Sequence, residues 1–364
     1  MTYLIDLHHL GAQQTGNETW TANIARELAR SGLPDGTFTY AVTAAGRERA
    51  RELGCAPLRS ISASSVRRLA VDLPRLGTDA DALLVHYTLP PGSHRIGKVV
   101  LVHDLSFEHP HAARWLPPAS RLRMRRSVRL SVNRADVVLA PSEFTRREIA
   151  ATYDVDPARI LVAGNAVDPD LARRLDEQAA SVRRQAGRVL LVGNLLPRKN
   201  ARVVAMAVRL LRDRGAEATL RVVGRVDRRQ ATLAAEMSAL LGDAVSFSGY
   251  VSQDRLAREY LEASVFCFPS LYEGFGIPTL EAMQAGVPTI VADSTALPEV
   301  AGVAALTADP TEPEDWAAKI ATALTSGSSM TTLGRQRAEA YSWSESARVV
   351  TTALERADAK RAVR

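Results

Sequence analysis

The sequence predicts an α/β fold built on parallel sheets. Short apolar runs rich in β-branched residues recur along the chain and hardly alternate with polar residues, as in strands that are buried on both faces. The amphipathic stretches between them, such as 19–31 and 201–214, have the length of crossover helices. With 364 residues the chain exceeds the usual size of one domain, so two domains are expected.

The apolar runs fall into two series of expected strands. The first series covers 3–7, 83–86, 99–103, 137–141 and 160–162, and the second covers 189–192, 220–223, 245–247, 265–269 and 289–292. The irregular stretch 164–170 separates the two series and is the expected hinge, which predicts domains at 1–166 and 167–340. Ligands of open α/β sheets bind beyond the carboxyl ends of the strands, so we expect a site in the cleft between two facing sheets.

Composition is typical of an ordinary globular protein. The chain is 46% hydrophobic and 24% charged, and its net charge of +6 comes mostly from arginine. No zinc-finger spacing or RNA-binding aromatic motif accompanies that charge, so no nucleic-acid partner is expected. Cys55 and Cys267 are too few for a metal cluster and lie far apart, which predicts free thiols in the cytoplasm. Neither a signal peptide nor a run of ~20 apolar residues is expected.

Arginines are concentrated in the stretch 121–129, which predicts an amphipathic helix. Five arginines alternate there with apolar residues: Arg121, Arg123, Arg125, Arg126 and Arg129 with Leu122, Met124, Val128 and Leu130. One interpretation is a solvated helix face. The other is a weak peripheral contact with anionic lipid, because a basic amphipathic helix can lie at a membrane interface.

The segment 269–283 carries the strongest chemical signal, because it follows an expected strand and opens an expected helix. Gly274 and Gly276 allow backbone to approach a ligand closely, and Pro278 suits a first helical turn. We expect free N–H groups between Ile277 and Leu280 to bind an anion with the help of the helix dipole. The segment therefore predicts a seat for a diphosphate.

Two glutamates flank this seat. Glu273 precedes the glycine loop, and Glu281 lies eight positions later, one turn inside the expected helix. Carboxylates accept hydrogen bonds from hydroxyls, so sugar or ribose hydroxyls are suitable partners. The competing interpretation is an ordinary strand-to-helix connection with a capping glutamate, because a glycine-rich turn alone is weak evidence.

The residues around the seat resemble a known enzyme family. Glu-Gly-Phe-Gly-Ile-Pro-x-Leu-Glu-Ala-Met at 273–283, followed by Ala-Gly-Val-Pro at 285–288 and Leu-Pro-Glu-Val at 297–300, is similar to glycosyltransferase family 4. The resemblance continues in 192–200, 249–252 and 341–343. It implies the GT-B fold, with two Rossmann-like domains facing a cleft. The second domain would hold the donor nucleotide sugar, and the last helix, within 341–364, would pack back on the first domain.

The resemblance implies donor-binding roles residue by residue. Glu281 would hold the ribose hydroxyls, Glu273 would contact the transferred sugar, and Lys199 would neutralise the diphosphate leaving group. The other implied donor-binding residues are Arg198, Tyr250, Val251, Gly274, Phe275, Gly276, Ile277, Thr279 and Leu280. Many members have an arginine where this chain has Asn194. Either Arg198 takes over that charge, or stabilisation of the diphosphate depends on Lys199 and the helix N-terminus alone. Without the motif, Arg198 and Lys199 would be interpreted as a solvated turn.

The N-terminal half has a looser set of matches. The loop 15–19, with Gly16 and Asn17, resembles the family loop whose backbone meets the donor phosphates. His103 matches a histidine that contacts the donor sugar at the catalytic centre, which makes it a candidate catalytic residue beside Glu273 and Lys199. Taken alone, His103 would be interpreted as a strand-end histidine.

Other polar residues of this half are expected on the acceptor side. His8, His9 and His86 end or follow expected strands. Asp104, next to His103, is expected either to orient that histidine or to contact an acceptor hydroxyl.

The function that these matches imply is a retaining glycosyltransferase. It would move a hexose, with mannose from GDP-mannose favoured and a UDP-sugar as the alternative donor, to an acceptor hydroxyl. No cofactor or metal is expected, because Lys199, Arg198 and helix amides can neutralise the leaving diphosphate. Two alternatives stay open: a nucleotide-sugar epimerase or hydrolase of the same fold, and a non-catalytic nucleotide-sugar binding partner.

Overall fold

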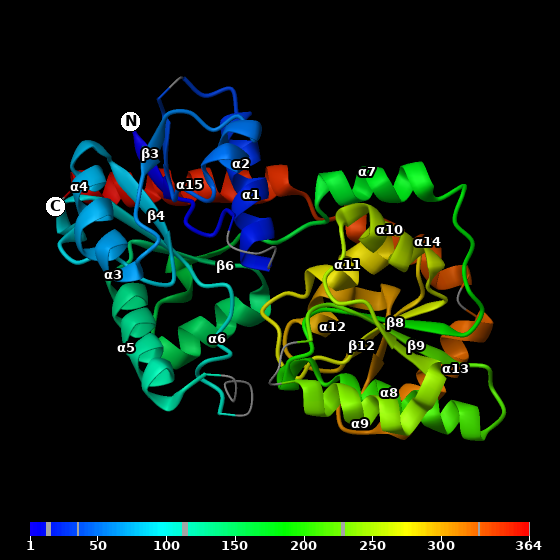
Figure 1. Ribbon diagram of the computed structural model, residues 1–364. Coiled ribbons are helices and arrows are strands. Elements are labelled where there is room, and N and C mark those ends of the chain that lie inside the picture. Colours follow the sequence, from blue (N-terminus) through cyan, green and yellow to red (C-terminus); the bar gives the residue numbers. More distant parts are fainter. Residues whose placement is uncertain (12–15, 35, 111–115, 227–229, 327, 364) are drawn as a thin grey trace. The chain divides into compact units, whose positions relative to one another are not determined.

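The chain divides into two units, each built on one parallel sheet (Figure 1). The computed structural model describes residues 1–11, 16–34, 36–110, 116–226, 230–326 and 328–363. The first unit comprises Met1–Glu108, Pro117–Asn165 and Ser342–Arg364, and the second unit comprises His109–Leu116 and Ala166–Tyr341.

The first unit has a seven-stranded sheet in the order β3-β2-β1-β4-β5-β6-β7. Its strands are β1 (Tyr3–Asp6), β2 (Phe38–Val42), β3 (Leu58–Ser60), β4 (Ala82–His86), β5 (Gly97–Leu101), β6 (Val137–Ala140) and β7 (Ile160–Val162). Its helices are α1 (Gly16–Ala29), α2 (Arg47–Glu52), α3 (Ser65–Arg67), α4 (Leu73–Leu76), α5 (Pro118–Arg134), α6 (Glu143–Tyr153) and α15 (Trp343–Ala362). The central strands are buried along their whole length, as a sheet covered on both faces requires.

The C-terminal helix α15 belongs to the first unit although the chain reaches it from the second. It packs against β5 and α1, and Figure 1 shows it in red among the blue and cyan elements. The Ser346 hydroxyl donates to the carbonyl of Gly164 at 2.6 Å, and Lys360 Nζ donates to the carbonyl of Asp136 at 3.1 Å. These contacts attach both ends of the helix to the sheet and to the segment that leaves it.

The second unit has a six-stranded sheet in the order β10-β9-β8-β11-β12-β13. Its strands are β8 (Arg188–Val192), β9 (Thr219–Val223), β10 (Val245–Phe247), β11 (Val265–Phe268), β12 (Thr289–Ala292) and β13 (Leu306–Ala308). Its helices are α7 (Pro169–Gln178), α8 (Ala201–Asp213), α9 (Ala231–Leu241), α10 (Gln253–Glu262), α11 (Ile277–Gln284), α12 (Leu297–Ala301), α13 (Pro313–Ser326) and α14 (Ser328–Glu339). Because all strands are parallel, the loops that follow β8, β9, β10 and β11 gather at one edge of the sheet.

The predicted fold class is confirmed, and each of the ten expected strands is present. The stretches 19–31, 121–129 and 201–214 lie in α1, α5 and α8 with small shifts of their ends. The prediction missed β2, β3 and β13. The last two are three-residue edge strands with exposed positions, and the polar Thr39 and Tyr40 interrupt the apolar pattern of β2.

Candidate functional site

Three charged side chains meet at the carboxyl edge of the second sheet. Arg198 and Lys199 lie in a 3₁₀ turn, Pro197–Lys199, that follows β8, and Glu273 lies in the loop that follows β11. Since β8 and β11 are neighbours in the sheet, these two loops lie side by side. Arg198 Nη1 and Lys199 Nζ both donate to Glu273 Oε1, at 2.9 and 2.6 Å. We call Arg198, Lys199 and Glu273 the charge triad.

Backbone and ring contacts hold the charge triad in place. The Leu271 N–H donates to the Arg198 carbonyl at 2.7 Å, and the Glu273 N–H donates to Thr295 Oγ1 at 3.0 Å. Lys199 Nζ lies 4.6 Å from the centre of the Phe268 ring, a cation–π distance. The cations are therefore positioned by the protein itself.

The charges of the triad do not cancel. Burial would raise the pKa of the Glu273 carboxyl, but Lys199 and Arg198 outweigh burial and hold that pKa below its usual value. Glu273 is thus a carboxylate at neutral pH, and two cations with one carboxylate leave one positive charge. An anion at this edge of the sheet is attracted by that excess charge.

The glycine loop beside the triad leads into α11. Gly276 has φ = 100°, and a Cβ there would lie 2.6 Å from Leu297 Cδ2, so the loop needs glycine at this position. Phe275 and Ile277 bury their side chains in the core, so the loop is fixed from both sides of Gly276. The expectation of a free N–H at Thr279 is wrong. This N–H donates to the Gly276 carbonyl at 3.0 Å, because the first helical turn closes on that carbonyl.

Glu281, one turn inside α11, has a different environment from Glu273. Its Oε2 accepts a hydrogen bond from the Tyr260 hydroxyl at 2.6 Å. Burial raises the pKa of Glu281 to about 7, the Tyr260 hydrogen bond lowers it, and the Asp168 carboxylate raises it. The Glu281 carboxyl therefore titrates near neutral pH.

The loops after β8, β9 and β10 are tied together beyond the triad. Asn194 Oδ1 accepts from the Arg225 N–H at 3.1 Å, and the Gly224 N–H donates to the Gly249 carbonyl at 3.0 Å. Tyr250, which follows, is 56% exposed, and Val251 is half-buried. Asn194 thus links two loops, and it brings the backbone of Arg225, a residue that the sequence did not single out, to the same edge.

In the first unit, four histidines gather at the carboxyl edge of the sheet. His8 and His9 follow β1, His86 ends β4 and His103 follows β5, and these three strands are neighbours. His86 Nδ1 and His103 Nε2 are 2.9 Å apart and share a hydrogen bond. Trp20 on α1 meets both rings edge-on.

Burial keeps the inner histidines neutral. It lowers the pKa of His9 and of His103 to about 3 and that of His86 well below its usual value. His8 Nδ1 lies 2.9 Å from the buried Asp6 carboxylate. A neutral histidine can donate with one ring nitrogen and accept with the other, and the bond to His86 occupies Nε2 of His103.

The structure shows one contact of Asp104 and the place of two loop residues of this half. Asp104 Oδ1 accepts from the Ser106 N–H at 2.8 Å, while the His103 ring is hydrogen-bonded to His86 through Nε2. Gly16 and Asn17 are the first residues of α1, directly beyond the β1 edge, and Thr15 lies outside the described residues.

Comparisons with known proteins identify the family. The model "Glycosyltransferase Family 4" matches residues 15–171, and the model "Glycosyl transferases group 1" matches residues 173–340. The O-antigen chain mannosyltransferase B of Escherichia coli is 32% identical over 264 residues, which cover 69% of this chain and 68% of that protein. The chain belongs to glycosyltransferase family 4. It is a glycosyltransferase, as its sequence predicts.

A second relative supports the family assignment, and a solved structure shows the fold of this glycosyltransferase. The O-antigen chain mannosyltransferase RfbU of Salmonella typhimurium is 28% identical over 250 residues, which cover 68% of this chain and 66% of that protein. The matches thus span about two thirds of the length of these two relatives. The structure of Anabaena HepE in complex with UDP and glucose has a TM-score of 0.72 at 17% identity and covers 98% of this chain and 99% of its own. That likeness shows the GT-B fold.

Three further expectations concern features outside the carboxyl edges of the two sheets. Cys55 and Cys267 are free and buried, which confirms the expected free thiols. Among the described residues, no group of three His, Cys, Asp or Glu side chains is arranged to hold a metal ion. No helix in the described part of the chain has the length and apolar character that a membrane span requires.

Several arginines of α5 make contacts within the first unit of the glycosyltransferase. Arg121 donates to the carbonyls of Phe107 and Glu108, both at 2.7 Å, and Arg125 pairs with the Glu108 carboxylate. Arg129 lies over the ring of Tyr153 at 5.8 Å. These contacts explain much of the basic pattern as intramolecular structure.

Proposed function

We propose that this glycosyltransferase moves a hexose from a nucleoside-diphosphate sugar to an acceptor hydroxyl, with retention of configuration and without a metal ion. The charge triad is the observation that carries the proposal: two fixed cations with one excess positive charge lie beside the glycine loop and α11. Mannose is the favoured sugar, because the relatives from Escherichia coli and Salmonella typhimurium are named mannosyltransferases. GDP-mannose is accordingly the favoured donor, and the UDP and glucose bound by Anabaena HepE keep a UDP-sugar as the alternative.

Each part of the donor edge has a proposed task. Lys199 and Arg198 bind the diphosphate, together with backbone N–H groups of the loop before α11. Glu273 keeps the two cations in place and accepts a hydrogen bond from the transferred sugar. Glu281 accepts hydrogen bonds from the ribose hydroxyls. The base is proposed to lie near Tyr250 and Val251.

Stabilisation of the leaving group is the main proposed catalytic effect. The bond from the sugar C1 to the β-phosphate oxygen breaks, and a bond from C1 to the acceptor oxygen forms on the same face of the sugar. The acceptor proton passes to the departing phosphate oxygen, whose new negative charge is met by Lys199 and Arg198. A carboxylate nucleophile is not invoked, because Glu273 is engaged by both cations. Neutral His103 is proposed as a hydrogen-bond partner of the sugar.

A thermal-shift screen tests the donor site. The protein is heated with GDP, UDP, ADP or dTDP and the corresponding sugar conjugates, each with and without EDTA. A ligand at ~100 times its dissociation constant adds about 2.7 kcal/mol, which shifts a domain of this size by several degrees. We expect one nucleotide family to give a shift that EDTA does not change and that Lys199→Ala removes. Lys319→Ala, a lysine on α13 of the same unit, is the matched control.

Turnover measurements test the stabilisation of the leaving group, and product stereochemistry tests the retention of configuration. Lys199→Ala should lower kcat by ~10²–10³-fold, as the loss of one fixed group that stabilises a developing anion does. Product NMR should show that the anomeric configuration of the donor is retained. A wild-type rate in Lys199→Ala, an inverted product or inactivation by EDTA would each contradict the corresponding part of the proposal.

A peripheral membrane contact through α5 is a second, separate proposal. It is favoured by Leu122 and Leu130, which are 47% and 57% exposed beside the exposed Arg123 and Arg126. Co-sedimentation with vesicles containing anionic lipid should be lost in a variant with glutamate at both leucine positions. Equal sedimentation of that variant would leave α5 as a solvated helix.

A further inference from the structure

A tyrosine that belongs to no recognised motif holds one of the two motif glutamates. Tyr260 lies on α10 and is completely buried. Its hydroxyl donates to Glu281 Oε2 at 2.6 Å, and its ring packs 5.8 Å from that of Phe266 on β11. A short hydrogen bond to a carboxylate from a rigid, buried side chain constrains both the direction and the ionisation of the carboxylate.

We propose that Tyr260 is a positioning residue of the ribose site, holding Glu281 Oε2 so that Oε1 is directed to the ribose hydroxyls of the nucleotide. The inference rests on the proposed role of Glu281 in donor binding. Tyr260 itself is too deeply buried to touch the nucleotide, so its effect passes through the carboxylate.

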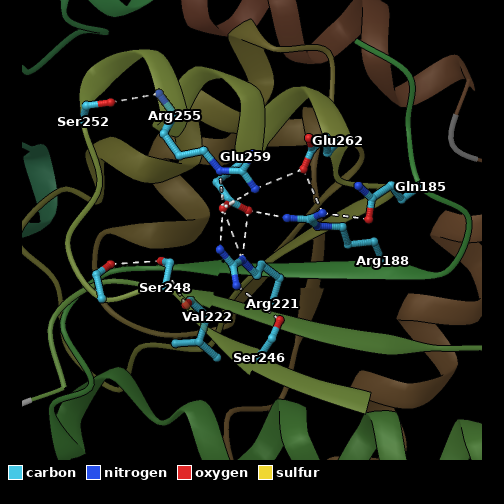
Figure 2. Close-up of polar contacts among 11 residues, drawn as sticks. Gln185, Arg188, Arg221, Val222, Ser246, Ser248, Ser252, Arg255, Glu259 and Glu262 are labelled. Carbon is cyan, nitrogen blue, oxygen red and sulfur yellow. Dashed lines mark hydrogen bonds and ion pairs between the residues drawn. The ribbon is translucent and has the colours of Figure 1, made fainter. Parts of the chain in front are cut away.

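The helix that carries Tyr260 is anchored next to it by a buried ion network (Figure 2). Glu259 is fully buried and accepts hydrogen bonds from Arg188 on β8, from Arg221 Nη2 on β9 at 2.7 Å and from Arg255 Nε at 2.9 Å. Arg188 Nη1 also donates to Glu262 at 2.8 Å. Figure 2 shows the arginine side chains converging from both strands on Glu259.

This network anchors the turn of α10 that carries Tyr260. Burial would raise the pKa of Glu259, but the hydrogen bond and charge of Arg221, with Arg188 and Arg255, hold that pKa below its usual value. Glu259 therefore stays charged and binds α10 to two strands of the sheet. Tyr260 is the next residue along the helix, so its hydroxyl has little freedom to follow Glu281 if the carboxylate moves.

Electrostatics make the role of Tyr260 measurable. Two titratable groups act on Glu281: the Tyr260 hydroxyl of α10, which favours the carboxylate, and Asp168 before α7, which disfavours it. Removing the hydroxyl should raise the pKa of Glu281 above about 7. The carboxylate that accepts ribose hydroxyls would then form only at higher pH.

The experiment compares two ligands that differ only in the ribose hydroxyls. Binding of GDP and of 2′,3′-dideoxy-GDP is measured by calorimetry between about pH 6 and about pH 9, with the UDP pair in parallel. The variants are Tyr260→Phe and Glu281→Gln. The matched control is Tyr153→Phe, because the buried Tyr153 donates to Glu108 Oε1 at 3.1 Å in the first unit.

We expect Tyr260→Phe to weaken the preference for GDP over dideoxy-GDP at neutral pH and to regain that preference at higher pH. Wild type and Tyr153→Phe should prefer GDP over its dideoxy form, increasingly as pH rises through about 7. In Tyr260→Phe the preference at neutral pH should fall about tenfold, its rise should move to higher pH, and the affinity for dideoxy-GDP should not change. In Glu281→Gln the preference should not depend on pH.

The other outcomes separate the inference from the function on which it rests. If Tyr260→Phe keeps the wild-type preference and pH profile while Glu281→Gln loses the pH dependence, the inference is overturned and the ribose role of Glu281 stands. If Tyr260→Phe weakens both ligands equally, the tyrosine is only structural and the inference also fails. If Glu281→Gln keeps the wild-type pH profile, or if wild type binds neither pair, the donor assignment falls together with the inference.

Discussion

Replacing Glu281 by glutamine should stabilise the second unit at alkaline pH. The pKa of Glu281 rises from 4.5 to about 7 on folding, chiefly by burial. A carboxyl whose folded pKa is raised keeps a proton that the unfolded chain releases, so stability falls as pH rises from 4.5 to about 7. At ~1.4 kcal/mol per pKa unit, ionising the folded carboxyl costs about 3 kcal/mol. Glutamine is neutral, has nearly the same shape and can still accept from Tyr260.

Scanning calorimetry at about pH 5 and about pH 8 measures this effect. At the acidic pH the difference between the variant and wild type should be small. At the alkaline pH, Glu281→Gln should unfold at a temperature ~6–12 °C higher, because 1 kcal/mol shifts a domain of this size by ~2–4 °C. Glu217→Gln, at an exposed position in the same unit, should change neither value. A variant that is equally stable or less stable than wild type at the alkaline pH would refute the reasoning.

Three other substitutions or titrations test the remaining contacts. Glu259→Gln leaves three buried or half-buried arginines facing a neutral group. Urea unfolding should show that the free energy of unfolding falls by ~3–5 kcal/mol. A fall below ~1 kcal/mol would mean that the network is not stabilising. Ring ¹⁵N NMR should find His86 and His103 neutral down to at least about pH 5. Because burial lowers their folded pKa values, stability should fall as pH drops below 6.5, and titration of either ring near 6.5 would contradict this. Gly276→Ala should lower the unfolding temperature, with a loss of ~1–3 kcal/mol in the free energy of unfolding. The φ of 100° is strained for alanine, and the new Cβ would lie 2.6 Å from Leu297 Cδ2. An unchanged unfolding temperature would show that the loop relaxes.

Strand composition explains which part of the fold was predictable. Central strands such as β1, β5 and β6 are buried on both faces, so selection for burial leaves an apolar run in the sequence. The edge strands β3 and β13 have one open side, and their hydrogen bonds to a neighbour require no apolar run. Their pairing depends on the rest of the sheet, which three residues of sequence do not reveal.

The candidate site was predictable where topology brings loops together. Lys199 and Glu273 are 74 residues apart, but each follows one of two neighbouring parallel strands, so their meeting follows from the fold. Contacts made by side chains on helices could not be predicted from the order of the strands. Tyr260 on α10 and Glu281 on α11 meet through the tertiary structure, and no spacing in the sequence marks that contact. The hydrogen bond of the Thr279 N–H likewise depends on how the first turn of α11 closes.

The two motif glutamates show how neighbouring positions acquire different chemistry. Glu273 and Glu281 are eight residues apart, and Glu273 is buried whereas Glu281 is half-buried. Cations hold the pKa of Glu273 below its usual value, while desolvation of its carboxyl raises the pKa of Glu281 to about 7. Glu273 is therefore charged at any pH near neutrality and can serve as a constant partner of Lys199 and Arg198. Glu281 is only partly ionised there, so its strength as a hydrogen-bond acceptor depends on Tyr260 and Asp168. The preference for a nucleotide over its form without ribose hydroxyls should accordingly rise with pH near neutrality through Glu281. The terminal phosphate titrates at about pH 6 in both ligands, so its effect on binding to the triad cancels from this preference.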